Sequence, residues 1–122
     1  MDGQQAFTNF VQKTLSQEKA ERFTALAASK KGQKKILESF YHQFEPAIRT
    51  DAIRVSGRER IWDSPCYVFH QPLGFGMEFN SVGEAYNQLS IDDGWLILVR
   101  DASAGMCRPE EKWDDEKFII AK

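Results

Sequence analysis

Residues 95–99 read Trp-Leu-Ile-Leu-Val, a run of five apolar side chains that directly follows the turn-forming pair Asp93-Gly94. A strand with one solvated face would alternate apolar and polar side chains, and this run does not. We therefore expect residues 95–99 to form a central strand that is covered on both faces of its sheet. The rest of the chain must then supply the neighbouring strands and the covering layers.

The first third of the chain carries the spacing of amphipathic helices. Apolar residues three and four positions apart predict helices over residues 5–15, from residue 16 to about 28, and from residue 29 to about 44. Ser16 and Ser29 can cap the second and third helices, and Pro46 ends the third. Gly32 fits either the end of the second helix or the first turn of the third.

Near residue 50 the hydrophobic period changes to two. Residues 53–61 predict an edge strand, or a hairpin that turns at Ser56-Gly57. Residues 66–70, which lie between two prolines, predict a better strand, and residues 118–120 predict a last one.

Three further segments lie between these strands. The apolar alternation over residues 73–79 predicts a strand or loop that packs on the core. Ser81-Val82-Gly83-Glu84 has the pattern of a capping box and predicts a short helix over residues 82–89. The segment that contains Ala104-Gly105 and Pro109 is interpreted as a polar connection.

Together these patterns predict a single α+β domain over residues 1–122, with a helical part at about 5–48 and a sheet part at about 52–121. Three N-terminal helices pack on a small, mainly antiparallel or mixed sheet of about four strands, with one short helix between strands. A chain of 122 residues is long enough to bury a core without help from a metal or a disulfide.

Composition and charge narrow the class of protein. No apolar run reaches the length of a membrane span and the first ten residues lack the pattern of a signal peptide, so we expect a cytoplasmic protein with no membrane partner. In that compartment we expect Cys66 and Cys107 to be reduced, and a disulfide between them is the alternative. The net charge of −2 divides into +4 over residues 1–60 and −6 over residues 61–122, so the two parts either attract each other or steer a charged partner.

Four lysines gather at the predicted start of the third helix: Lys30, Lys31, Lys34 and Lys35. Like charges at this spacing repel one another, and the positive end of a helix disfavours cations. An anion relieves both effects, and phosphate, nucleic acid or an acidic protein surface can supply it. The alternative is a solvated basic turn.

Arg54, Arg58 and Arg60 share one parity of the segment predicted to be extended, together with Trp62. Cations beside an aromatic ring are typical of single-stranded nucleic acid binding. The sequence pI of about 5.7 is low for such a protein. The arginines and the four lysines are the candidate nucleic-acid or phosphate surface.

The cysteines raise the question of an enzyme. Cys66 and His70 lie about 13 Å apart along a regular strand, too far for a thiol–imidazole hydrogen bond. Cys107 can still meet His70 or His42 through folding, and the neighbouring Arg108 favours a thiolate. No metal-ligand spacing, complete dinucleotide fingerprint or phosphate loop is present, so no metal or cofactor is expected.

An acidic stretch near the C-terminus contains one aromatic residue, Trp113, which is followed by Asp114, Asp115 and Glu116. It is interpreted either as a solvated loop or as an anchor for a basic protein partner.

The expected function is that of a small binding or regulatory domain that acts through contacts with an unidentified protein partner or with a second copy of the chain. A nucleic-acid or phosphate-binding protein is the first alternative. A cysteine-dependent enzyme is the second.

Overall fold

The structure is a computed structural model that describes residues 1–38, 47–54, 57–89, 93–108 and 116–121. Three helices come first: α1 (Gly3–Thr14), α2 (Gln17–Ala27) and α3 (Lys30–Glu38). The strands follow: β1 (Ile53–Arg54), β2 (Cys66–His70), β3 (Gly74–Phe79), β4 (Trp95–Val99), β5 (Ala104–Arg108) and β6 (Lys117–Ile120). Short helical turns are η3 (Thr50–Ala52), η4 (Arg58–Arg60) and α4 (Val82–Tyr86).

The α+β class is confirmed, but the sheet has six strands instead of about four. Its order is β1-β6-β5-β4-β2-β3, and every neighbouring pair is antiparallel. Residues 95–99 form β4, which has β2 on one side and β5 on the other, and all five side chains are buried. The expected central strand is therefore confirmed.

Strand β5 is where the sequence prediction of a polar connection was wrong. Its residues, Ala-Gly-Met-Cys-Arg, lack β-branched and aromatic side chains, so local preference gives no strand signal. The segment is a strand because it fills the space between β4 and β6, where its backbone groups pair on both sides. Gly105 suits this place because an added Cβ would lie 2.7 Å from the carbonyl oxygen of Ile97.

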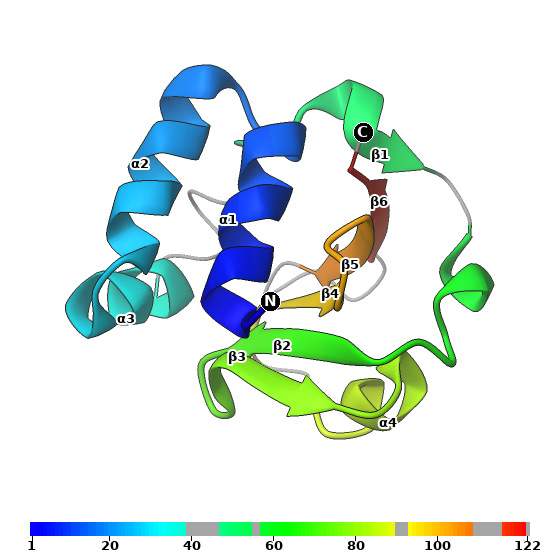
Figure 1. The fold of residues 1–122 in the computed structure, drawn as a ribbon. Helices are drawn as coiled ribbons and strands as arrows, with labels where there is room; N and C mark the ends of the chain where they lie inside the picture. Colours follow the sequence, from blue (N-terminus) through cyan, green and yellow to red (C-terminus); the bar gives the residue numbers. More distant parts are fainter. Residues whose placement is uncertain (39–46, 55–56, 90–92, 109–115, 122) are drawn as a thin grey trace.

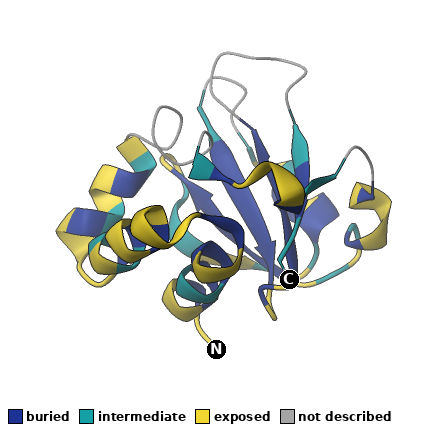
Figure 2. Ribbon diagram, turned by 90° about the horizontal axis from the view of Figure 1, so that it is seen from above, coloured by how far each residue is buried: buried dark blue, intermediate teal, exposed yellow. Residues whose placement is uncertain are grey.

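The sheet is covered on both faces by different elements. On one face, α1, α2 and α3 pack with Phe69, Leu96 and Ile119 in a continuous apolar core. On the other face, α4 and the residues after η4 pack with Trp95 and Met106. Figure 1 shows α1 and α4 on opposite sides of β2 and β3, and Figure 2 shows the buried strands between exposed helical surfaces.

The helix starts follow the sequence signals with one exception. The Ser29 Oγ accepts a hydrogen bond from the Gly32 amide at 3.0 Å, and the Ser81 Oγ accepts one from the Glu84 amide at 3.1 Å. Ser16 occupies the cap position of α2, but its side chain makes no capping hydrogen bond. Helix α4 is shorter than the predicted 82–89, and residues 39–46 of the predicted third helix lie outside the described residues.

The predicted strand over residues 53–61 is confirmed at β1 and is wrong over residues 57–61, while residues 55–56 lie outside the described residues. Strand β1 pairs with β6, not with residues that follow a hairpin turn. Gly57 has a φ of 133°, a conformation that glycine favours, and the chain then forms the helical turn η4. The chain is therefore not extended over residues 57–60, and the single parity on which the arginine face depended does not hold there.

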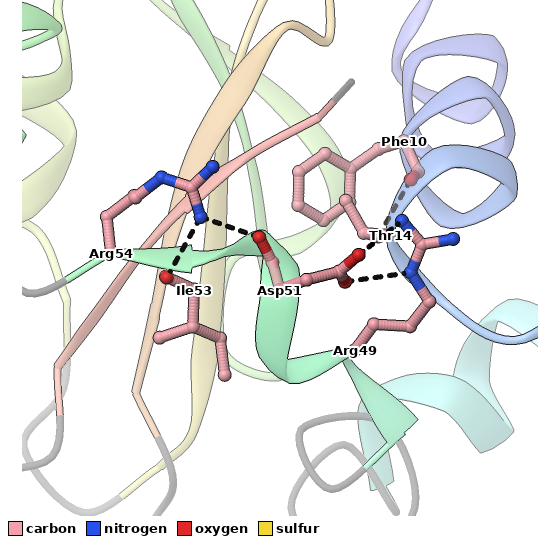
Figure 3. A network of polar contacts seen from close by, with 6 residues as sticks. All are labelled: Phe10, Thr14, Arg49, Asp51, Ile53 and Arg54. Carbon is pink, nitrogen blue, oxygen red and sulfur yellow. Dashed lines mark hydrogen bonds and ion pairs between the residues drawn. The ribbon is translucent and has the colours of Figure 1, made fainter.

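The helical layer is tied to the sheet edge at β1 by a polar network (Figure 3). The Arg49 amide donates to the Thr14 carbonyl oxygen at 2.7 Å, and the Arg49 guanidinium forms an ion pair with the Asp51 carboxylate at 3.1 Å. The Arg54 guanidinium donates to the carbonyl oxygens of Asp51, at 2.6 Å, and of Ile53, at 3.1 Å. The end of α1 and the start of β1 are thereby held together.

Candidate functional site

The four lysines lie on the outer face of α3, where all four side chains are exposed. The opposite side of the helix is fixed, because Ile36 is fully buried and Gly32 lies against α2. A Cβ on Gly32 would be 1.9 Å from the Leu26 carbonyl oxygen, so this helix contact needs glycine. We define the exposed side chains of Lys30, Lys31 and Lys34 as the lysine face.

Among the residues that the structure describes, one ion pair involves the lysine face. The first turn of α3 holds no acidic residue. Lys34 lies 3.9 Å from the Glu38 carboxylate, and the two side chains are 78% and 48% exposed, so this pair contributes little. The Lys35 side chain already takes part in an interaction within the chain, so the lysine face does not include it. The lysine face is thus a local excess of positive charge.

The three arginines do not form the single face that the sequence predicted. Arg54 donates to backbone carbonyl oxygens (Figure 3). Arg58 stacks over the rings of Trp62, at 5.2 Å, and Tyr86, at 5.5 Å. Arg60 lies in a separate groove. Of these three arginines, Arg58 is the one that stacks on Trp62 as the sequence predicted. This contact lies within the folded chain and is not a contact to a ligand.

The four lysines lie on α3, and two of the three arginines, Arg58 and Arg60, lie in η4 at the other side of the molecule. Figure 1 shows α3 at one side and η4, which follows β1, at the other. Charges separated by more than about 8–10 Å are largely screened at physiological salt. The structure therefore does not bring the predicted lysines and arginines together as one nucleic-acid surface.

Glu116 is held inside a polar cluster on the side of α4. Its carboxylate forms an ion pair with Arg58 at 3.2 Å and accepts a hydrogen bond from the Tyr86 hydroxyl. Burial raises the pKa of Tyr86, and its hydrogen bond to the Glu116 carboxylate raises it further. The Glu116 side chain is only 21% exposed. Trp113, Asp114 and Asp115 lie outside the described residues.

The two cysteines are buried on opposite faces of the sheet. Cys66 packs in the core under α4, and Cys107 packs in the core under α1. Burial raises the pKa of the Cys66 thiol from its ordinary value of 9.0 to about 12, despite the opposing charge of Arg100. Cys66 is therefore a thiol, not a thiolate, at neutral pH.

His70 cannot act as a base for Cys107 across the sheet. It lies opposite Trp95, which lies opposite Arg108, so these three residues share one face. Cys107, one position along β5, points to the other face. The His70 ring is fully buried, with its Nδ1 2.9 Å from the Gly94 carbonyl oxygen. His42 lies outside the described residues.

Grooves on the described surface include three that border candidate or polar residues. One, of about 570 Å³, lies between α1, α2 and Arg49, and another, of about 240 Å³, lies beside Arg58 and Glu116. The third, of about 420 Å³, lies where η4 and the β4–β5 turn meet. It is lined by Arg60, Ser64, Arg100, Asp101 and Ser103.

Sequence reasoning missed Arg100 and its groove. Residue 60 and residue 100 are linked by no periodicity, because they come together only through the pairing of β2 with β4. The one local signal is a cation directly after the apolar run of residues 95–99.

The described residues also bear on metal binding and on insertion into a membrane. Within them no three His, Cys, Asp or Glu side chains are grouped as metal ligands. None of the helices that the structure describes has both the length and the apolar content to cross a bilayer.

Comparison of the chain with family models, with curated proteins and with solved structures finds no match. The function must therefore be inferred from the geometry of the chain itself.

Proposed function

We propose that this chain is a protein-binding domain whose lysine face docks an acidic surface of a partner protein. The observation that carries the proposal is the exposure of Lys30, Lys31 and Lys34 together. Among the described residues, their one ion pair is the contact of 3.9 Å between Lys34 and Glu38. An acidic partner offsets the repulsion among these charges and speeds the encounter.

The rigidity of α3 supports a docking role. Its inner side is fixed by buried Ile36 and by the close contact of Gly32 with α2. Its N-terminus is capped by Ser29. The three ammonium groups are consequently presented from a supported helix, which lowers the entropy lost on binding.

The size of the face favours an acidic protein over nucleic acid. The nine residues of α3 extend about 13 Å at 1.5 Å per residue. Tight nucleic-acid binding commonly uses about 6–10 phosphate contacts along a longer path. The arginines that would extend this path are at the other end, and two of them are engaged within the chain.

The test measures binding of a labelled polyglutamate peptide at low salt, with a random single-stranded oligonucleotide in parallel. The variant Lys30→Gln/Lys31→Gln/Lys34→Gln is compared with Lys13→Gln/Lys19→Gln/Arg22→Gln, which removes the same charge from α1 and α2. Three exposed pairs at about 0.5 kcal/mol each predict roughly tenfold weaker peptide binding for the α3 variant.

The control variant should bind the peptide within about twofold of the wild type, since screened charges elsewhere contribute little. Equal weakening by both variants would show a general charge effect and reject the lysine face. Tighter binding of the oligonucleotide than of the peptide, lost in the α3 variant, would favour the nucleic-acid alternative.

A further inference from the structure

The groove between η4 and the β4–β5 turn has two walls that are fixed by backbone hydrogen bonds. The Arg100 amide donates to the Pro65 carbonyl oxygen at 3.1 Å and joins one wall to the other. The Ser64 amide donates to the Ile61 carbonyl oxygen at 2.9 Å, and the Ser64 carbonyl oxygen accepts from Val82 at 2.9 Å. The backbone that carries the groove's polar side chains is therefore held in place before any ligand binds.

The groove holds two arginines whose charge is not compensated by an ion pair. Arg60 comes from η4 and Arg100 from the turn after β4, and both side chains are exposed. Neither forms an ion pair with any carboxylate of the described part of the chain, in contrast to Arg49 and Arg58. Two guanidinium groups from separate segments thus line one concave surface.

Among the described residues that line this groove, Asp101 is the one acidic side chain, and it is hydrogen-bonded within its own turn. The Asp101 Oδ1 accepts a hydrogen bond from the Ser103 amide at 2.9 Å. Hydrogen bonds from the Ser103 side chain and backbone lower the pKa of Asp101, so this carboxylate is charged at neutral pH. Two cations and one anion leave the groove with a net positive charge.

We propose that this groove binds a phosphoryl group, through Arg60 and Arg100 with the Ser64 hydroxyl as a further donor. The planar fork of each guanidinium can donate two parallel hydrogen bonds to phosphate oxygens. A phosphoryl group offers three terminal oxygens to donors on two walls, whereas a carboxylate offers two. The volume of about 420 Å³ suits a small phosphate ester.

This inference is independent of the lysine face, because it uses none of the residues of α3. The two proposals can therefore fail separately.

The test titrates the isotope-labelled protein with O-phospho-L-serine, with inorganic phosphate and with acetate, followed by NMR. We expect saturable shifts at the Arg60 and Arg100 amides with both phosphate probes and none with acetate. Tighter binding of phosphoserine would identify an ester as the ligand, and equal binding would identify the phosphate ion; both support phosphoryl recognition.

Variants that remove a positive charge and a variant that removes a negative charge should change the affinity in opposite directions, which makes the test specific. Arg100→Gln and Arg60→Gln should each weaken phosphoserine binding about tenfold, because each removes a charge-assisted contact. Asp101→Asn should strengthen it severalfold, because the amide oxygen still accepts from Ser103 while one negative charge is lost. Lys31→Gln should leave the affinity unchanged.

These substitutions lie on the surface, and unfolding curves check that each variant is folded. Absence of saturable shifts with both phosphate probes would overturn the proposal. Equal affinity in the wild type and in the folded Arg60→Gln/Arg100→Gln double variant would overturn it as well, because the phosphate would then bind elsewhere.

Discussion

Burial of the Cys66 thiol makes the stability of the native protein depend on pH. An unfolded chain ionises this thiol at its ordinary pKa of 9.0, whereas burial holds the native pKa at about 12. Between these values the unfolded chain has released a proton that the native chain keeps. The stability that Cys66 contributes is therefore complete below pH 9 and is lost as the pH rises toward 12.

Urea unfolding at pH 8 and at pH 10 measures this loss. The wild type should lose about 1.4 kcal/mol more than Cys66→Ala over this interval, because the unfolded thiol titrates across it and one released proton corresponds to about 1.4 kcal/mol per pH unit. Val68→Ala serves as the control, because it also removes buried volume from β2 but leaves the thiol in place. If Cys66→Ala and Val68→Ala lose stability equally with pH, the thiol ionises as freely in the native chain as in the unfolded one.

At the scale of elements, the structure offers two serines with the same cap position and different hydrogen bonding. Ser81 caps α4 through a hydrogen bond of 3.1 Å from the Glu84 amide, while the Ser16 side chain makes no such bond to α2. We expect Ser81→Ala to lower the free energy of unfolding by about 1 kcal/mol. Ser16→Ala should change it by less than about 0.5 kcal/mol, as is usual for exposed positions away from such contacts.

Thermal and urea unfolding of the two variants check this difference under one set of conditions. If Ser16→Ala and Ser81→Ala lower the free energy of unfolding equally, then a serine at the cap position stabilises its helix even without a side-chain hydrogen bond.

The elements that the sequence predicted well are those whose signal is local. The run at residues 95–99 and the apolar stripe of α1 each need only their own side chains to be recognised, and both elements formed as expected. Strand β5 needed knowledge of its neighbours, because its backbone is paired on both sides while its side chains carry no strand preference. The prediction of an arginine face failed because Gly57 has a positive φ and Arg58–Arg60 form a helical turn, so Arg54, Arg58 and Arg60 do not share one extended segment.

The candidate sites also differ in whether local sequence was enough to predict them. The lysine face could be predicted because Lys30, Lys31 and Lys34 lie within one helix, where spacing alone decides which side chains are neighbours. The groove of Arg60 and Arg100 could not, because its two walls are forty residues apart and meet only through the sheet.

At the scale of the whole molecule, the lysine face belongs to α3, and the groove of Arg60 and Arg100 lies where η4 meets the β4–β5 turn. Figure 1 shows α3 and η4 on opposite sides of the molecule. The two surfaces share no residue, and exposed charges more than about 8–10 Å apart are largely screened at physiological salt. Free-energy changes at distant sites with no common contacts add within about 0.5 kcal/mol. We therefore expect the two surfaces to act independently.

A double-mutant cycle tests this independence with Lys30→Gln/Lys31→Gln/Lys34→Gln and Arg60→Gln/Arg100→Gln, separately and combined. The lysine variant should weaken polyglutamate binding and leave phosphoserine binding unchanged, and the arginine variant should do the reverse. In the combined variant each affinity should equal that of the corresponding single set within about twofold. A coupling larger than this in a folded combined variant would mean that the fold transmits a change between the two surfaces, or that both probes bind one shared surface.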